Sequence, residues 1–68
     1  MQHERRIHIH SDMKGGIWIH EEGTDPATVK ECDDLLDAIS QARQLANGRA
    51  ATLTAFDALG KVIFSERL

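Results

Sequence analysis

Residues 35–46 read LLDAISQARQLA, and this stretch decides the fold. Its apolar residues recur three or four positions apart, at Leu35, Ala38, Ile39, Ala42, Leu45 and Ala46. That spacing is typical of an amphipathic helix that buries one face. We expect the helix to run from about Asp34 to Asn47. Asp34 can act as its N-cap, and Asn47-Gly48 can end it, because glycine adopts the left-handed conformation of a C-terminal cap.

The segment before this helix leaves two alternatives open. Thr28 with Glu31 could form a capping box that starts the helix early, or Val29 could be extended and cross the end of the sheet. We favour the later start at Asp34, because Asp37 follows three residues on as in a variant of the box. Upstream, residues 22–26 read EGTDP and end the preceding strand, since proline has no N–H for a strand ladder.

Two segments upstream alternate apolar and polar residues with the period of a half-buried strand. They read RIHIH at residues 6–10 and IWIH at residues 17–20, joined by the glycine-containing turn SDMKGG. If burial keeps all four isoleucines on one face, the opposite face carries the remaining side chains, which are His8, His10, Trp18 and His20. The sequence therefore predicts a hairpin with histidines and the single tryptophan on one side.

A second hairpin follows the helix, at residues 51–56 and 61–65 around the turn DALG. Asp57 first and Gly60 last are typical of a type I turn closed by a glycine bulge. The register stays open here. Either Phe56, Val62 and Phe64 face the helix, or a set including Leu53, Ala55 and Ile63 does so.

These elements predict an α+β domain with the order ββαββ. With a right-handed crossover through the helix, the third strand lies beside the first, which gives a four-stranded antiparallel sheet of order 2-1-3-4. One helix then covers one face and leaves the other open. We expect residues 1–68 to form a single domain in which residues 1–5 are flexible.

Composition limits the classes of function. The chain has 68 residues and a net charge of −3, so a basic footprint for nucleic acid is not visible and Arg5 and Arg6 are its only clustered candidates. A chain this short buries only about 60% of its unfolded surface, which favours self-association. The single cysteine and the absence of an apolar run of membrane length lead us to expect a reduced, cytoplasmic protein without a membrane partner.

Several motifs together resemble a family of short bacterial proteins that is catalogued as a domain of unknown function. The similarity spans roughly residues 16–66 and rests on these positions: Trp18-Ile19, Glu22-Gly23, Asp34, Asp37-Ala38-Ile39, Ala42-Arg43, Leu45-Ala46, Asp57 and Gly60-Lys61-Val62. The family has a Trp-containing strand, a Thr-x-x-Glu-Ala-Ile helix start and an Asp-x-x-Gly-Lys-Ile hairpin. The chain departs from it in carrying Asp34 and Asp37 at the helix start. The resemblance implies the ββαββ architecture and no catalytic residue.

The histidines are the only cluster with ligand chemistry. His8, His10 and His20 could present three imidazoles to one zinc or nickel ion, since alternate residues of a strand share a face. The alternative is a polar strand face with no metal, which we favour because no closed ligand set is present. We expect no cofactor.

Trp18 is better explained as a contact residue than as a base-stacking platform, given the acidic charge of the chain, and the alternative is simple partial burial by Lys14 or the N-terminal arm. Cys32 lies beside Asp33 and Asp34, which would raise the pKa of its thiol, so we expect a small apolar filler instead of a nucleophile. No Ser-His-Asp arrangement or phosphate loop is present.

We therefore predict a small non-enzymatic module for protein interaction or regulation, a homodimer whose partner-binding residues are Trp18, His8, His10 and His20. One alternative is a nucleic-acid-associated regulator, antitoxin-like or phage-derived, that uses the open sheet face with Arg5 and Arg6. The other is a metal-binding protein built on the histidine cluster.

Overall fold

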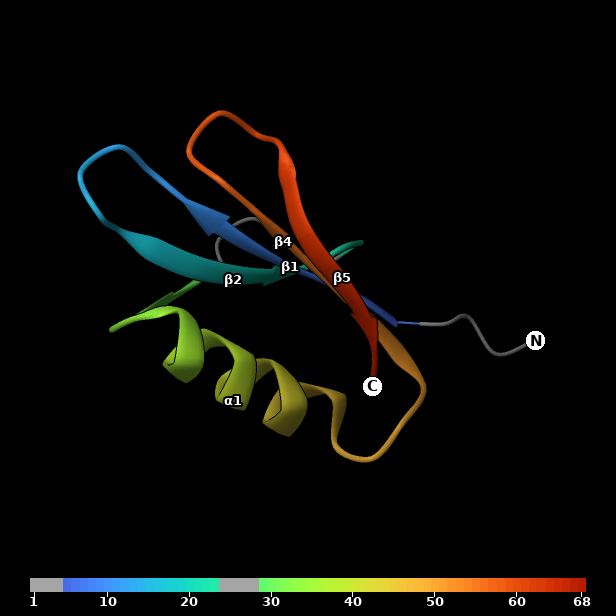
Figure 1. Ribbon diagram of the computed structural model, residues 1–68. Coiled ribbons are helices and arrows are strands. Elements are labelled where there is room, and N and C mark those ends of the chain that lie inside the picture. The colour runs from blue at the N-terminus through green and yellow to red at the C-terminus, as the bar shows by residue number, and fades with distance from the viewer. Residues whose placement is uncertain (1–4, 24–28) are drawn as a thin grey trace.

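The computed structural model describes residues 5–23 and 29–68, in which one helix packs on one face of a five-stranded sheet (Figure 1). The helix is α1 (Leu35–Ala46). The strands are β1 (Arg5–Ser11), β2 (Ile17–Glu21), β3 (Lys30–Cys32), β4 (Ala51–Phe56) and β5 (Val62–Arg67). Their spatial order is β3-β2-β1-β4-β5. The α+β class and the single helix agree with the sequence prediction.

The sheet is mixed, so the prediction of four antiparallel strands is wrong. β1 pairs with β4 in parallel, while the other three pairings are antiparallel. The reason is the short extra strand β3, which reverses the chain once more before the helix. The helix then returns the chain so that β4 enters in the direction of β1. The relative order of the four predicted strands is nevertheless the observed one.

The start of the helix follows the later of the two alternatives. Asp34 is the N-cap, and its carboxylate accepts a hydrogen bond from the backbone N–H of Asp37 at 2.7 Å. The Asp37 carboxylate in turn accepts from the N–H of Asp33 at 2.9 Å. At the other end, Asn47 occupies the left-handed capping position with φ 51°, and Gly48 follows with φ 75°.

The core is made of small helix residues against larger strand residues. The helix buries only alanines, and their size lets the helix backbone lie close to the sheet. The buried residues are Ala38, Ala42 and Ala46 from α1 with Ile7, Ile9, Ile19, Ala51, Leu53 and Ala55 from the strands. Leu35 and Ile39 pack beside them. Leu45, which the helical spacing placed in the core, is exposed at the margin.

The second hairpin combines the two registers that the sequence left open. Leu53 and Ala55 are buried beneath the helix, and Phe64 packs against the same core. Phe56 follows the alternation of β4 onto the other face and pairs with Val62, and the register shift at this point skips Ile63 of β5. The predicted turn is present, since Gly60 has φ 82° and the Asp57 carboxylate accepts from the N–H of Lys61 at 2.8 Å.

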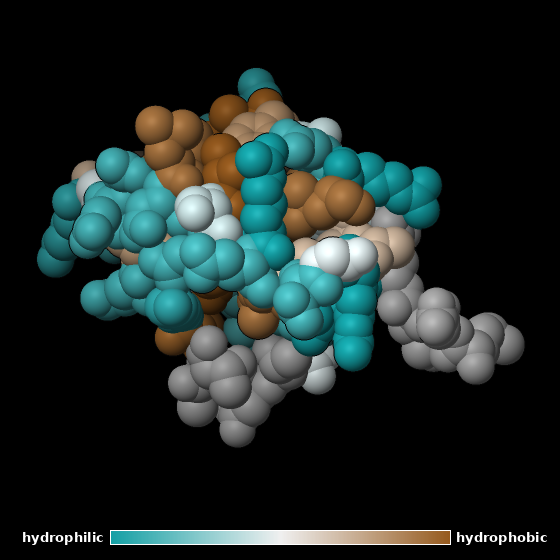
Figure 2. Space-filling model, turned by 90° about the horizontal axis from the view of Figure 1, so that it is seen from below, coloured by the Kyte–Doolittle hydropathy of each residue, from teal (hydrophilic) through white to brown (hydrophobic). Residues whose placement is uncertain are grey.

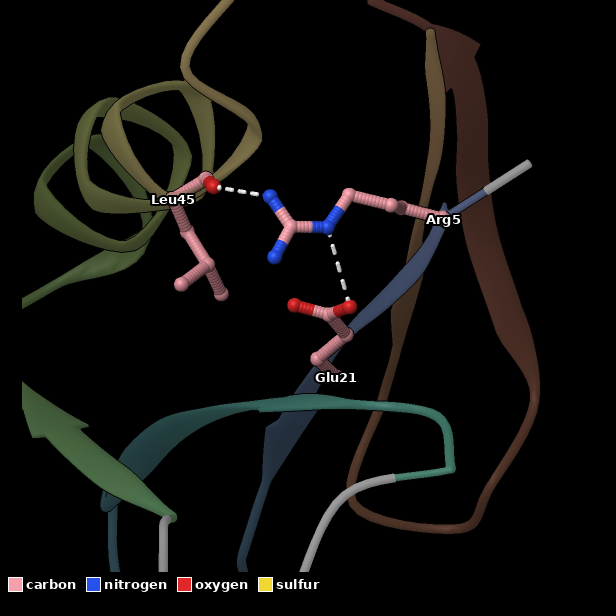
Figure 3. Close-up of polar contacts among 3 residues, drawn as sticks. All are labelled: Arg5, Glu21 and Leu45. Atoms are coloured by element: carbon pink, nitrogen blue, oxygen red, sulfur yellow. Dashed lines mark hydrogen bonds and ion pairs between the residues drawn. The ribbon is translucent and has the colours of Figure 1, made fainter. Parts of the chain in front are cut away.

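Arg5 fastens the helix to the sheet at the charged end of β1 (Figure 3). Its Nε donates to the carboxylate of Glu21 on β2 at 3.1 Å, and its guanidinium also donates to the carbonyl of Leu45 at 2.8 Å. Arg5 is the only one of the expected flexible residues 1–5 that the structure describes. The predicted turn around Asp25 and Pro26 lies outside the described residues.

Seen from the helix side, the surface is mostly hydrophilic, with hydrophobic groups showing between the polar ones (Figure 2). Leu36 is the most exposed large apolar residue of the helix, with 78% of its surface exposed. The only helix in the described ranges is too short and too polar to cross a membrane.

Candidate interaction surface on the open sheet face

The register of the first hairpin brings the four predicted contact residues to the sheet face opposite the helix. His10 pairs with Trp18 and His8 with His20, whereas Ile9 and Ile19 pair on the helix side. The predicted segregation of isoleucines from histidines is therefore confirmed. We call this uncovered side of the sheet the open face.

Three cross-strand rows make up the open face. The aromatic row contains Trp18, His10 and Phe56 from β2, β1 and β4, and Glu31 of β3 pairs with Trp18 at its outer edge. The middle row contains His20, His8, Thr54 and Ser65. The charged row, at the opposite end of the strands, contains Glu22, Arg6, Thr52 and Arg67. The open face is thus aromatic at one end, where the exposed Glu31 of β3 borders the row, and charged at the other.

Rings stack against one another within the aromatic row. His10 lies between Trp18 and Phe56, with ring centroids 5.8 and 5.2 Å apart and interplanar angles of 22° and 8°. His8 contacts both His10 and Phe56 edge to face, at 5.8 and 5.4 Å. Each pair has the offset or edge geometry that aromatic rings prefer. The row is consequently a preformed patch whose side chains support each other.

Phe56 is the member of this surface that the sequence analysis did not assign. A signal for it exists, because Phe56 continues the alternation of Thr52 and Thr54, and these threonines cannot both face an apolar core. Alternation along the strand therefore predicts that Phe56 shares their face. The aromatic side chain of Phe56 favours the opposite placement, in the core beneath the helix.

The apolar end of the open face continues onto β5 and the hairpin turns. Val62 pairs with Phe56, and Val62 and Ile63 are 52% and 54% exposed. The turns between β1 and β2 and between β4 and β5 emerge from the same end of the sheet, because β1 and β4 are parallel (Figure 1). Each turn carries one exposed apolar residue, Met13 or Leu59. Several exposed apolar side chains therefore lie at this end of the sheet.

Arg5 and Arg6, the candidates for nucleic-acid contact, lie on opposite faces. Arg5 is on the helix side and is held by Glu21 and Leu45. Arg6 is on the open face, 3.8 Å from the carboxylate of Glu22. The two arginines are therefore not brought together into one basic patch.

His10 sits in a setting that favours its neutral form. Burial lowers the pKa of His10, and the neighbouring His8 and His20 lower it further. The imidazole of His8 lies 3.5 Å from the carboxylate of Glu22. Burial and the two neighbouring imidazoles therefore both disfavour the charged form of His10.

His8, His10 and His20 share a face, but their arrangement is not that of a metal site. Within residues 5–23 and 29–68, no group of three or more histidine, cysteine, aspartate or glutamate side chains is placed to hold one ion. Two of the imidazoles are instead engaged with aromatic rings.

Cys32 lies on β3 at the margin of the core. Burial raises the pKa of its thiol, and Asp37 and Asp33 add to the effect while Lys30 opposes it. The expected direction is therefore correct, although burial, not the neighbouring acids, is its first cause. A thiol of raised pKa is a poor nucleophile.

A second feature is an open hollow of about 290 Å³ between the end of α1 and β5. It is lined by Arg43, Ala46, Gly48, Arg49, Glu66 and Leu68. Arg43 and Glu66 form an ion pair at 3.1 Å across it. This ion pair therefore links α1 to the edge strand β5 of the sheet.

Comparisons with family models, with curated proteins and with solved structures found no match to this chain.

Proposed function

We propose that this chain is a small, cytoplasmic, non-enzymatic interaction module that binds a protein partner, including a second copy of itself, through the open face. The observation that carries the proposal is the aromatic row of Trp18, His10 and Phe56. Aromatic residues gathered in one patch and bordered by polar groups are typical of protein contact sites, and the middle row supplies that border here. Trp18, His8, His10 and His20 are the partner-binding residues in this proposal.

The packing of the rings favours a protein partner over single-stranded nucleic acid. Bases bind to sheet surfaces by stacking on ring faces that are open to solvent. Both faces of the His10 ring are directed at its neighbours, since it lies nearly parallel to Trp18 and Phe56. The net charge of −3 and the Arg6–Glu22 pair also work against phosphate binding.

Self-association tests the proposal directly. Sedimentation equilibrium at tens of micromolar and neutral pH compares the unchanged protein with Trp18→Ser and with the control Leu36→Ser. Leu36 is the matched control because it is a large, exposed apolar residue on the opposite side of the molecule. We expect Trp18→Ser to shift the protein toward monomer and Leu36→Ser to leave the association unchanged. The reverse pattern would move the contact surface to the helix.

A further inference from the structure

The two ends of the open face differ, because the aromatic row lies at one end of the strands and the charged row at the other. This difference restricts how two copies can pack against each other. Two sheets that pack face to face keep their strands within about 30° of each other. A two-fold axis in the contact plane then runs either along the strands or across them. The first choice sets each row against the same row of the second copy. The second choice sets the aromatic row against the charged row.

Setting unlike rows together is unfavourable. It would place Arg6 over His10 and Glu22 over Trp18, so charged groups would lose water against aromatic rings without gaining a partner. Like rows keep charged groups away from the rings, because the aromatic rows then bury each other, the exposed Glu31 lies over the edge strand β5, and the charged rows stay at the solvated margin. We infer that two copies of this chain pair back to back with the two-fold axis running along β1.

This arrangement rests on the proposed function and makes the open face complementary to itself. β2 of one copy lies over β4 of the other, so Trp18 meets Phe56 and forms two equivalent aromatic contacts. At the charged end, Glu22 lies over Thr52 and next to Arg67, which is an attractive pairing. The two Arg6 side chains meet at the axis, where each has Glu22 at 3.8 Å as its own counter-charge.

The size of the face predicts a moderate affinity. Five strands about 4.8 Å apart and three rows deep present a flat area of about 450 Å². Two such faces in contact remove roughly 1,000 Å² of accessible surface, which is near the lower limit of specific protein interfaces. The pair should therefore form at micromolar concentrations and separate on dilution.

Residues on the axis distinguish the two arrangements, because each then lies beside its own copy. Arg6 and His10 lie on β1 outside the middle row and meet their own copies only when the axis runs along the strand. Thr54 lies in the middle row and meets its own copy only when the axis runs across the strands. His8 belongs to both sets and is not informative.

Cysteine cross-linking tests which way the two-fold axis runs. On a Cys32→Ser background, the variants Arg6→Cys, His10→Cys and Thr54→Cys are oxidised mildly at tens of micromolar and read on a non-reducing gel. We expect Arg6→Cys and His10→Cys to give at least tenfold more disulfide-linked dimer than Thr54→Cys. Arg6 is exposed, so its replacement keeps the test valid if His10→Cys disturbs the aromatic row.

The outcomes separate this inference from the proposed function. Preferential cross-linking of Thr54→Cys would overturn the axis along β1, while dissociation by Trp18→Ser would still support contact through the open face. A protein that sediments as a monomer and gives no cross-link in any variant overturns the second copy as the occupant. Cross-linking that survives Trp18→Ser without loss would contradict a contact built on the aromatic row.

Discussion

Replacing Arg5 or Arg6 by alanine should have very different consequences, although the two residues are adjacent and carry the same charge. Arg5 is 31% exposed and makes two polar contacts, to the 16%-exposed Glu21 at 3.1 Å and to the carbonyl of Leu45 at 2.8 Å (Figure 3). Arg6 is 66% exposed, and its contact with Glu22 is 3.8 Å long. The difference follows from strand alternation, which directs neighbouring side chains to opposite faces.

The magnitudes can be worked from these contacts. A hydrogen bond from a charged donor contributes about 1.5–3 kcal/mol, and a partly exposed ion pair adds about 0.2–1 kcal/mol, so Arg5→Ala should cost about 2 kcal/mol. Arg6→Ala should change the free energy of unfolding by no more than about 0.5 kcal/mol. For a domain of this size, 2 kcal/mol lowers Tm by about 10 °C and is a large part of a total stability of roughly 3–10 kcal/mol.

Urea unfolding followed by circular dichroism, at a protein concentration low enough to keep the chain monomeric, measures both variants. The reasoning predicts a clear fall in the midpoint for Arg5→Ala and little change for Arg6→Ala, with the same slope in both. Equal losses in the two variants would refute the assignment of Arg5 as the link between helix and sheet.

Three further predictions concern the cap, the histidines and metal. Asp34→Ala should cost about 1 kcal/mol more than Asp33→Ala in urea unfolding, because only Asp34 caps the helix; equal costs would contradict this. Burial lowers the pKa of His10, so the unfolded chain binds more protons below about pH 6.5 and stability should fall as the pH drops from 6.5 toward 5. That slope should weaken in His10→Gln, and an unchanged slope would assign it to another group. One equivalent of zinc should raise Tm by no more than a few degrees; a one-to-one micromolar isotherm that is lost in His8→Ala would overturn this.

The sequence predicts correctly those helices and strands whose apolar side chains alternate or recur with a clear period. The isoleucines of the first hairpin predicted the composition of the open face, and Asp34 predicted the start of the helix. Both signals are local, since they depend on strand alternation and on a single capping carboxylate.

The features that were missed depend on pairing between distant segments. β3 is three residues long and its sequence, KEC, has neither an apolar period nor β-branched residues, so nothing in it indicates a strand. Its presence reversed the predicted direction of β4 and made the sheet mixed. Phe56 is a different case, because the alternation of β4 places it on the open face and only its aromatic side chain favours the core.

An NMR dilution series is the most direct test of our proposal that the open face is the contact surface. Backbone amide spectra of the ¹⁵N-labelled protein are recorded from a few micromolar to several hundred micromolar at neutral pH. We expect the amide chemical shifts that change with concentration to belong to the aromatic and middle rows, centred on His10 and Trp18. The shifts of the exposed side of α1 around Leu36 should stay constant. Changes confined to α1, or spectra that do not depend on concentration, would contradict it.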